Sequence, residues 1–596
     1  MQTDKNSSPG NFILAIDFGS THAFARIYNE KCESLAESVI SSKTTDPEVC
    51  WTVMNNLIEA VLKRARVRPI DLNCLGISVQ RNTFLLWNRE TSRPVTRLCT
   101  WQETNASSYA SSRNRSHFVK VLNKSGRLLY KIAPIAKFKM ISHYQLTCIF
   151  SVTRLAHMFQ EDPTLYEKCR NGELVYGCLE TWLLWRLTGG QAWCTDASCT
   201  SASGAFDPSI LGLSPVVLNF LKISPKIFPP ICPTCTFFGE VRCGPLADIG
   251  NYPSKSSPRR VRVTALIGDS QAGMLGEGCL NVGDAKLTLG TGSFLCVNIG
   301  SALVPPNTGF YPVVGWSKST LTDESLSCED VPDIKLEDVT FLLEGFNSDA
   351  GNSLVKLKEV GFFDSYSELE DTLKSITASF DATLDGSSYF IPSSLGLRSS
   401  STKFLLRMEN FEKALSFVNT NTSLIDGGIF VGLPLKEKGQ MCLTESLKRA
   451  ALFALMDSLV MAARLLFVKG VNKELTSEIK VLRVNGNLTR SDWLMQRLAD
   501  TLNLPVERSS TSETCCLGAA IAAGVGAGIW ETYDDAVQLL RASRTRFEPI
   551  PSSVLRMQRR YLYWTGVCAK VIVAHDSRFC EFGEVIALND LVCLAL

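Results

Sequence analysis

The sequence predicts an α/β protein made of two related domains. In each half of the 596-residue chain, a short apolar run is typical of a buried strand and ends beside an aspartate, with a hairpin around a Gly-rich turn close by. The first run is 11–16, followed by Asp17, and the second is 261–267, followed by Asp269. A chain of this length exceeds what one hydrophobic core covers, so two large domains are expected.

The first predicted domain spans residues 11–260. Its first hairpin joins strands 11–16 and 25–28 through the turn Gly19-Ser20-Thr21, and a polar, Pro- and Ser-rich stretch at 251–260 predicts a surface linker at its end. Apolar spacing predicts further elements between these limits: helix 51–65, strand 75–79 and a Trp/Leu-rich helix at 180–187.

The second predicted domain spans residues 261–548, and 549–596 is a C-terminal tail to which the sequence assigns no role. Strand 261–267 is followed by a hairpin at 285–299, and residues 318–426 show few clear periods. Two later elements are expected, a long apolar helix at 445–467 and a strand at 478–484 that runs into Asn485-Gly486-Asn487.

Composition excludes several classes of protein. The net charge of +2 leaves no overall electrostatic footprint for nucleic acid or an anionic membrane. The most apolar window, 515–530, is too short for a transmembrane segment and is expected to be a tightly packed internal helix. The polar N-terminus carries no secretory signal, and the 21 cysteines are scattered, which favours reduced thiols over a disulfide frame. We therefore expect a cytoplasmic protein without a nucleic-acid partner; assembly into a homo-oligomer is compatible with the sequence.

A carboxylate and a glycine turn follow each other in the second half. Asp269 stands at a strand end, where its side chain could accept a proton from a ligand. The turn Gly290-Thr291-Gly292 can bring backbone N–H groups close to an anion, because glycine has no Cβ. Together they form the minimum equipment for phosphorylating an alcohol. Taken alone, Asp269 could equally be the N-cap of a helix over 271–276.

Three other segments hold candidate ligand-binding side chains. Asp17 could hold Mg²⁺ through water while Gly19-Ser20-Thr21 contacts phosphate, although an ordinary hairpin with a capping aspartate would look the same. Gln80-Arg81 and Trp101 could bind the hydroxyls of a polyol, but an isolated Trp101 is more often a core residue. The chain has no P-loop motif of the Gly-x-x-x-x-Gly-Lys-Ser/Thr type.

These motifs, in this order, resemble those of the FGGY carbohydrate kinases. Asp17-Phe-Gly-Ser-Thr21 is similar to the first phosphate motif of the family, Gly268-Asp-Ser-Gln271 to its catalytic motif, and 285–294 to its second phosphate motif. Within the family, Gln80-Arg81, Trp101-Gln102 and Gly309-Phe-Tyr-Pro312 look most like glycerol kinases.

The resemblance implies a fold, a reaction and a site. The expected fold is two ribonuclease H-like domains of the actin/Hsp70 ATPase superfamily facing a central cleft. The implied reaction transfers phosphate from ATP, with Mg²⁺ near Asp17, to glycerol, and Asp269 is the implied base. The implied phosphate- and ATP-binding residues are Gly19, Ser20, Thr21, Gly290, Thr291, Gly292, Gly486 and Asn487. The implied substrate-binding residues are Gln80, Arg81, Asn82, Trp101, Asp269 and Ser270.

Three positions differ from the family pattern. Phe24 stands where the family has an arginine in its first phosphate loop, with Arg26 two residues on; Asn82 replaces an acidic substrate ligand; and Asn487 replaces a glycine on the adenine side. These differences leave two alternatives open: a catalytically weak or inactive relative with a binding or regulatory role, and a kinase for another sugar or polyol.

Overall fold

The computed structural model forms two compact units that are not contiguous in sequence. The first contains Met1–Val282, Cys296–Glu344 and Glu513–Ala542, and the second Gly283–Leu295, Gly345–Ser512 and Ser543–Leu596. The residues it describes are 11–247, 260–290, 292–306, 310–317, 334–347, 351–359, 361–378, 388–392, 428–431, 444–471, 473–510, 513–540, 543–576 and 585–587.

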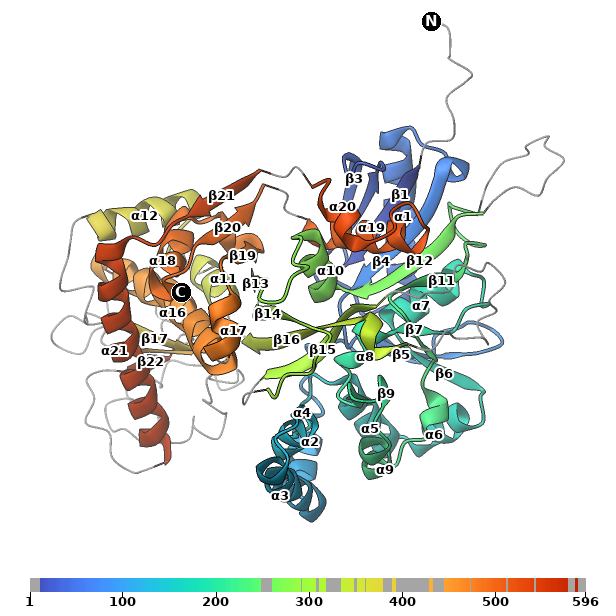
Figure 1. The fold of residues 1–596 in the computed structure, drawn as a ribbon, viewed down its shortest axis with the longest axis horizontal. Helices are drawn as coiled ribbons and strands as arrows, with labels where there is room; N and C mark the ends of the chain where they lie inside the picture. Colours follow the sequence, from blue (N-terminus) through green and yellow to red (C-terminus); the bar gives the residue numbers. More distant parts are fainter. Residues whose placement is uncertain are drawn as a thin grey trace, which may run out of the picture. The chain divides into compact units, whose positions relative to one another are not determined.

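The first unit is organised around a six-stranded mixed sheet in the order β11-β12-β4-β1-β2-β3 (Figure 1). β1, β2 and β3 form an antiparallel meander, whereas β4 lies parallel to β1 and β12 parallel to β4. The strands are β1 (Phe12–Phe18), β2 (His22–Tyr28), β3 (Ser34–Ser41), β4 (Leu72–Val79), β11 (Cys235–Glu240) and β12 (Arg262–Gly268).

Both faces of this sheet are buried because its strands are apolar on both sides. Leu14 and Ile16 of β1 belong to one hydrophobic cluster with helices α1 (Pro47–Ala65) and α7 (Leu179–Leu187). Ile13 and Ala15 belong to a second cluster with α10 (Asp269–Gly276) and α19 (Thr514–Gly526). Helix α19 overlaps the window 515–530 predicted to be an internal helix, beginning one residue before it and ending at Gly526, and most of its residues are buried.

The remaining elements of the first unit lie beyond this sheet. α2, α3 and α4 form a separate helical group in Figure 1, and the antiparallel pair β5/β6 leads into α7. The elements are η1 (Pro69–Asp71), β5 (Phe84–Asn88), α2 (Ser107–Asn114), α3 (His117–Ile132), α4 (Ala136–Ser142), α5 (Ser151–Glu161), α6 (Pro163–Arg170), β6 (Leu174–Cys178), β7 (Thr195–Asp196), α8 (Ala197–Ser201), β8 (Phe206–Asp207), β9 (Gly212–Leu213), α9 (Pro215–Leu221), η2 (Pro225–Ile227), β10 (Ile231–Cys232), β15 (Phe310–Ser317), η3 (Leu336–Asp338) and α20 (Tyr533–Val537).

Strand β12 belongs to the first sheet, although the sequence boundary at 260/261 assigned it to the second domain. It pairs with β4 over most of its length, so Asp269 follows the first unit's own sheet. The second hairpin, β13 (Ala285–Leu289) with β14 (Ser293–Gly300), resembles the hairpin of β1 and β2, but its first strand carries no aspartate, whereas β1 carries Asp17. Hydrogen bonding between strands, and not the order of the strands in the chain, decides which sheet β12 joins. Residues 251–259 of the predicted linker lie outside the described residues.

In the second unit, β14, β13, β19, β20 and β21 are neighbours in that order. β14 and β16 have residues in both units. The other elements are β16 (Val339–Asn347), α11 (Gly351–Glu359), α12 (Tyr366–Ala378), β17 (Tyr389–Pro392), β18 (Gly428–Val431), α16 (Glu445–Gly470), α17 (Lys473–Glu478), β19 (Leu482–Asn485), η6 (Asn487–Arg490), α18 (Asp492–Leu502), β20 (Val506–Ser509), β21 (Arg544–Phe547), α21 (Pro551–Asp576) and β22 (Val585–Ala587). Ordered elements thus occur within 318–426, where the sequence showed few periods.

A buried ionic cluster ties three helices of the second unit together. Asp457 of α16 accepts hydrogen bonds from Arg497 of α18 at 2.6 Å and from Arg560 of α21 at 2.5 Å. The side chain of Trp564 on α21 is also buried, and its indole N–H donates to the Phe390 carbonyl. The segment predicted to be a tail therefore begins with a helix that is part of the unit's core.

Helix α16 alone, among the described helices, is long and apolar enough to cross a membrane. The qualifying segment is Glu445–Val468, and 78% of its most apolar window is buried inside the protein. Burial of this extent, with Asp457 paired in the middle, is typical of the core helix of a globular unit.

Candidate active site

Three neighbouring parallel strands bring the predicted side chains to one edge of the first sheet. Phe18 of β1 pairs with Val79 of β4, and Val79 pairs with Gly268 of β12. Asp17, Gln80-Arg81 and Asp269 therefore all lie at the carboxyl ends of adjacent strands, which is where α/β sheets place their ligands.

Asp17 is buried and held by a neighbour that the sequence did not reveal. Its Oδ1 accepts a hydrogen bond of 2.6 Å from the Ser78 hydroxyl, since Asp17 and Ser78 are register partners on β1 and β4. A single oriented carboxylate fits Mg²⁺ held through water, because this ion keeps most of its hydration shell and binds through one or two carboxylates plus substrate phosphates.

The first glycine turn closes on itself. Gly19 N–H donates to the His22 carbonyl at 3.2 Å, and a Cβ on Gly19 would lie 2.9 Å from that oxygen. The Ser42 hydroxyl donates to the Gly19 carbonyl at 2.7 Å, which fixes the turn against the segment after β3. Ser20 is half-buried and Thr21 is exposed, so the tip of the turn faces outward, as a phosphate loop requires.

Arg26 does not take the place of the missing loop arginine. It lies two residues beyond Phe24 on the same face of β2, but its guanidinium forms an ion pair of 2.5 Å with Glu37 on the adjacent strand β3. The Arg64 guanidinium also donates to the Glu37 backbone carbonyl. The Arg26 guanidinium is therefore engaged with Glu37, and the position occupied by Phe24 remains apolar.

Arg81 stands between two carboxylates. Its Nη2 donates to Glu344 Oε1 and Oε2 at 2.9 and 2.8 Å, and its Nε lies 3.7 Å from Asp269 Oδ1. The Arg81 and Glu344 side chains are 9% and 1% exposed, whereas Asp269 is 38% exposed. Asp269 is therefore the solvent-accessible member of this group.

Glu344 is the buried anchor of this cluster. Its Oε1 accepts from the Tyr311 hydroxyl at 3.0 Å, and the Cys296 thiol lies 3.5 Å from Oε2. Burial alone would raise the pKa of Glu344, but the Arg81 guanidinium outweighs it and lowers that pKa below its usual value. Glu344 thus stays ionised and fixes the orientation of Arg81.

Gly268 makes room for Arg81 at the end of β12. A Cβ on this residue would lie 2.7 Å from Arg81 Cδ and 2.6 Å from Gln271 Oε1. Gly268 is also the N-cap of α10, and Asp269 is its first residue; the Asp269 carboxylate accepts from the Ser270 N–H at 2.7 Å. The N-cap interpretation of Asp269 therefore does not hold.

Three buried polar atoms beside this edge have no hydrogen-bond partner among the described residues. They are the acceptors Gln80 Oε1 and Gln271 Oε1 and the donor Arg81 Nη1. Buried polar groups are nearly always satisfied, so such atoms at a strand edge are candidate ligand-binding positions. An acceptor and a donor next to Asp269 match the needs of a hydroxyl-bearing ligand.

Asn82 has a different environment from the one its place in the motif implies. Its φ is +64°, a left-handed conformation that asparagine tolerates better than most residues. Its amide nitrogen donates to the Ala202 carbonyl at 3.1 Å, and its amide oxygen accepts from the Ser151 N–H at 3.2 Å. Asn82 therefore holds the loop after β4 in place, and its amide is engaged with backbone groups.

Arg154 links this loop to the Trp101 segment. Its fully buried guanidinium donates to the carbonyls of Asn82, Cys99 and Thr100. The backbone N–H of Trp101 donates to the Thr83 hydroxyl at 3.3 Å, and Trp101 is half-buried. Trp101 and Asn82 are thus drawn together through Arg154, which the sequence analysis missed.

The second unit brings together its own predicted nucleotide-side residues. Gly351 N–H, at the start of α11, donates to the Gly290 carbonyl at 3.0 Å, and a Cβ on Gly351 would lie 2.5 Å from that oxygen. Gly486, with φ +100°, approaches the adjacent Leu289 so closely that a Cβ would lie 2.3 Å from its carbonyl oxygen. Three backbone segments therefore meet where no side chain fits.

The residues around this junction complete the picture of the second unit. Gly292 is buried and its carbonyl accepts from the Gly290 N–H at 3.0 Å, which closes the turn; Thr291 lies outside the described residues. Asn487 is exposed and begins η6, so its side chain lies at the surface of the predicted adenine side.

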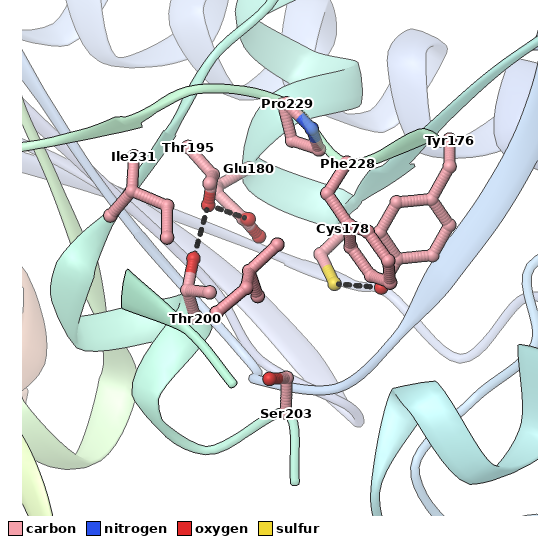
Figure 2. Close-up of a pocket in the computed structure, with 10 residues that line it drawn as sticks. Tyr176, Cys178, Glu180, Thr195, Thr200, Ser203, Phe228, Pro229 and Ile231 are labelled. Carbon is pink, nitrogen blue, oxygen red and sulfur yellow. Dashed lines mark hydrogen bonds between the residues drawn. The ribbon is translucent and has the colours of Figure 1, made fainter. Parts of the chain in front are cut away.

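A small, partly enclosed cavity in the first unit is a separate feature (Figure 2). Its volume of about 20 Å³ admits one water molecule and is too small for a polyol. Glu180 lines it, and Figure 2 shows the Thr195 hydroxyl bonded to Glu180 Oε1, at 2.8 Å, and to the Thr200 hydroxyl. Burial raises the pKa of Glu180 to about 7. Since the predicted site residues do not line it, we do not assign the cavity to the substrate.

Comparison with known proteins decides the family. The model of the FGGY family of carbohydrate kinases, N-terminal domain, matches residues 12–276, and the model of its C-terminal domain matches residues 285–527. The chain belongs to the FGGY family of carbohydrate kinases. This FGGY protein therefore has the predicted α/β two-domain fold, and the N-terminal match includes β12 and α10.

The FGGY protein is similar to several glycerol kinases. It is 27% identical to glycerol kinase 5 of Mus musculus, the paralogue that its motifs also resemble, over 552 residues that cover 91% of each chain. It is 27% identical to glycerol kinase of Coxiella burnetii (strain Dugway 5J108-111) over 544 residues, or 90% of this chain and 93% of the relative.

Solved structures show the same fold. The Plasmodium falciparum glycerol kinase with ADP matches with a TM-score of 0.71 at 21% identity, covering 94% of this chain and 98% of that one. The ligand-bound xylulose kinase of Lactobacillus acidophilus matches with a TM-score of 0.65 at 14% identity, covering 95% and 99%.

Sequence reasoning missed the residues that support the site. Glu344 was detectable, since it is a carboxylate inside the otherwise apolar run Phe341-Leu-Leu-Glu-Gly345. Ser78 and Arg154 carry no such signal, because a serine in a strand or an arginine in an amphipathic helix is ordinary.

Proposed function

We propose that this FGGY family member phosphorylates a polyol with ATP, and that its substrate is glycerol, converted to glycerol 3-phosphate. The observation that carries the proposal is the placement of Asp269 beside Arg81 at the carboxyl edge of β12, with Asp269 accessible and Arg81 fixed by Glu344. The similarity to glycerol kinases over most of the chain supports the choice of acceptor.

In the proposed mechanism, the Asp269 carboxylate accepts the proton of a primary hydroxyl. The hydroxyl oxygen then bonds to the γ-phosphorus of ATP while the bond from that phosphorus to the bridging oxygen breaks, giving the phosphate monoester and ADP. Because phosphoryl transfer has a loose transition state, positioning by Gln80, Arg81 and Trp101 matters more than the strength of the base.

The remaining predicted residues take part through the phosphates. Gly19, Ser20 and Thr21 in the first unit, and Gly290, Thr291 and Gly292 in the second, would contact phosphate oxygens through backbone N–H groups and hydroxyls. Asp17 would hold Mg²⁺ through water, and the ion would offset negative charge on the phosphates. Gly486 and Asn487 would line the adenine side.

Two observations favour a second candidate, a weak kinase or a binding protein. Arg26 is paired with Glu37, and the Asn82 amide is engaged with backbone groups, so neither replaces the missing family side chain. The described cysteines carry free thiols, which supports a cytoplasmic location in either case. Light scattering of the full chain measures whether it forms a homo-oligomer.

An assay of ADP release by the full chain separates the candidates. With Mg-ATP and glycerol, we expect turnover that falls about 10²–10⁴-fold in Asp269→Asn, the range for loss of a general base. The exposed Asp364→Asn serves as the matched control. A panel of longer polyols and ketoses tests the acceptor. Turnover no greater than that of Asp269→Asn on every acceptor would overturn the kinase proposal.

A further inference from the structure

Helix α3 of the first unit presents an unusual surface to solvent. Five of its large apolar side chains have exposed fractions between 40% and 74%. Ile135, immediately before α4, is 51% exposed. The five are Phe118, Val121, Leu128, Leu129 and Ile132. In Figure 1, α3 lies in the helical group with α2 and α4, apart from the sheet of the first unit.

These side chains share one face of the helix. At 100° per residue, all five fall within an arc of about 100°, which runs from Leu128 through Val121, Ile132 and Phe118 to Leu129. Contiguous exposed apolar patches of this kind mark interaction sites, whereas single exposed apolar residues are ordinary.

A basic stripe borders this apolar arc. Lys120, Lys124, Arg127 and Lys131 follow at spacings of three or four residues and occupy the neighbouring side of the helix. They take part in none of the ion pairs found among the described residues. The sequence contains no Asp or Glu between residues 104 and 160, so the region is strongly basic although the whole chain is nearly neutral.

The opposite face of α3 is fixed to the protein. Val119 is buried, the Ser116 hydroxyl caps the helix by accepting from the Val119 N–H, and the Asn123 amide donates to the Tyr144 carbonyl at 3.2 Å. The helix is therefore held with its apolar arc and basic stripe directed outward.

We propose that α3 binds an anionic lipid surface. A helix with Leu, Phe and Ile on one face and Lys and Arg beside them lies in the plane of a membrane interface, with the apolar arc at the acyl boundary and the cations on lipid phosphates. A second copy of this chain is a poorer occupant, because two basic stripes brought together repel each other. This membrane contact is independent of the proposed kinase reaction.

Vesicle flotation of the full chain tests the proposal. We expect binding to phosphatidylcholine vesicles that contain phosphatidylserine, weaker binding to phosphatidylcholine alone, and loss of binding as salt rises. The double variant Leu128→Ser/Ile132→Ser should lower the affinity about tenfold per side chain. Lys124→Glu/Lys131→Glu should lower it at least about fivefold per residue.

Matched controls separate this face from general surface effects. Val39→Ser/Val282→Ser changes two exposed apolar residues elsewhere in the first unit, and Lys63→Glu/Lys226→Glu reverses two other exposed charges. Both controls should float as the unmodified protein does. Absence of flotation with anionic vesicles at low salt, or equal flotation of the α3 variants, overturns the proposal. A dimer that only the α3 variants dissociate, without vesicle binding, also overturns it and assigns the face to a second copy.

Discussion

The Arg81 guanidinium and the Glu344 carboxylate form a buried ion pair, with Arg81 Nη2 at 2.8 and 2.9 Å from the two carboxylate oxygens. The same guanidinium reaches Asp269 through Nε at 3.7 Å. Glu344 therefore determines where the cation lies relative to the proposed base. Because Glu344 is inaccessible, its effect on a substrate passes through Arg81.

We predict that Glu344→Gln lowers kcat/KM for the polyol by about 10²-fold, the cost of a misplacement of roughly 1 Å at a reacting centre. It also leaves Arg81 buried without its charged partner, so the free energy of unfolding should fall by about 3–5 kcal/mol. Steady-state kinetics and urea unfolding measure the two effects. Tyr311→Phe, which removes one hydrogen bond to Glu344, should give a smaller loss of both. A folded Glu344→Gln protein with unchanged kcat/KM would contradict the positioning role.

We predict that Gly486→Ala weakens nucleotide binding while leaving the first unit unaffected. A Cβ at this position would lie 2.3 Å from the Leu289 carbonyl oxygen, and the φ of +100° is unfavourable for alanine, so the junction of Gly486 with the Gly290 turn must shift. Thermal shift with Mg-ATP measures the change; the unmodified protein at one hundred times its Kd should gain about 2.7 kcal/mol. Gly528→Ala, at a positive-φ glycine with no atom within 4 Å of the added Cβ, controls for backbone strain alone. Equal shifts in the two variants would disprove the assignment.

The second unit should lose stability in acid through Asp457. Burial alone would raise the pKa of Asp457, but Arg497 and Arg560 outweigh it and lower that pKa. A lowered folded-state pKa gives stability that is present above the unfolded value of about 3.9 and is lost as the pH falls through the folded value. Asp457→Asn should lower the free energy of unfolding by about 3–5 kcal/mol near neutral pH. It should also make that free energy depend less on pH in the acid range. Urea unfolding across acid pH checks this, with exposed Asp534→Asn as the control. An Asp457→Asn protein as stable as the unmodified one would refute it.

Glu180 predicts the opposite pH dependence in the first unit. Its pKa of about 7 lies above the usual 4.5, so the folded state binds a proton that the unfolded state releases between these values. Stability should fall as the pH rises through this window, by a free energy on the order of 3 kcal/mol. Glu180→Gln should remove this slope and be more stable than the unmodified protein near pH 8. Exposed Glu90→Gln should keep the slope, and a slope that survives Glu180→Gln would exclude this carboxyl as its source.

Local sequence patterns predicted the helices and strands well where apolar residues follow one clear pattern along the segment. The apolar run before Asp17 became β1, and the apolar windows at 445–467 and 515–530 became α16 and α19. The pattern failed for β12, because an apolar strand does not encode which sheet it joins. It also failed for α21, whose buried Trp564 and Arg560 gain their partners only from other helices.

The candidate site was predicted in part for the same reason. Residues at strand ends, such as Asp17, Arg81 and Asp269, are visible because polar side chains follow apolar runs. Their supports come from distant segments: Arg81 and Glu344 lie 263 residues apart, and Asp17 and Ser78 lie 61 apart. No local period links such pairs.

The sequence by itself determined the family, the fold class and the side chains that end the strands, because motif chemistry and apolar periodicity are properties of short segments. The tertiary structure alone decided that β12 joins the first sheet and that the Asn82 amide hydrogen-bonds to backbone groups. It also decided that Glu344 holds Arg81 beside Asp269. It also left one apolar and basic face of α3 open to solvent. These outcomes depend on strand register, burial and side-chain pairing between residues far apart in the sequence. The free energy of such a contact is set by residues from distant segments, so it cannot be predicted from the local sequence.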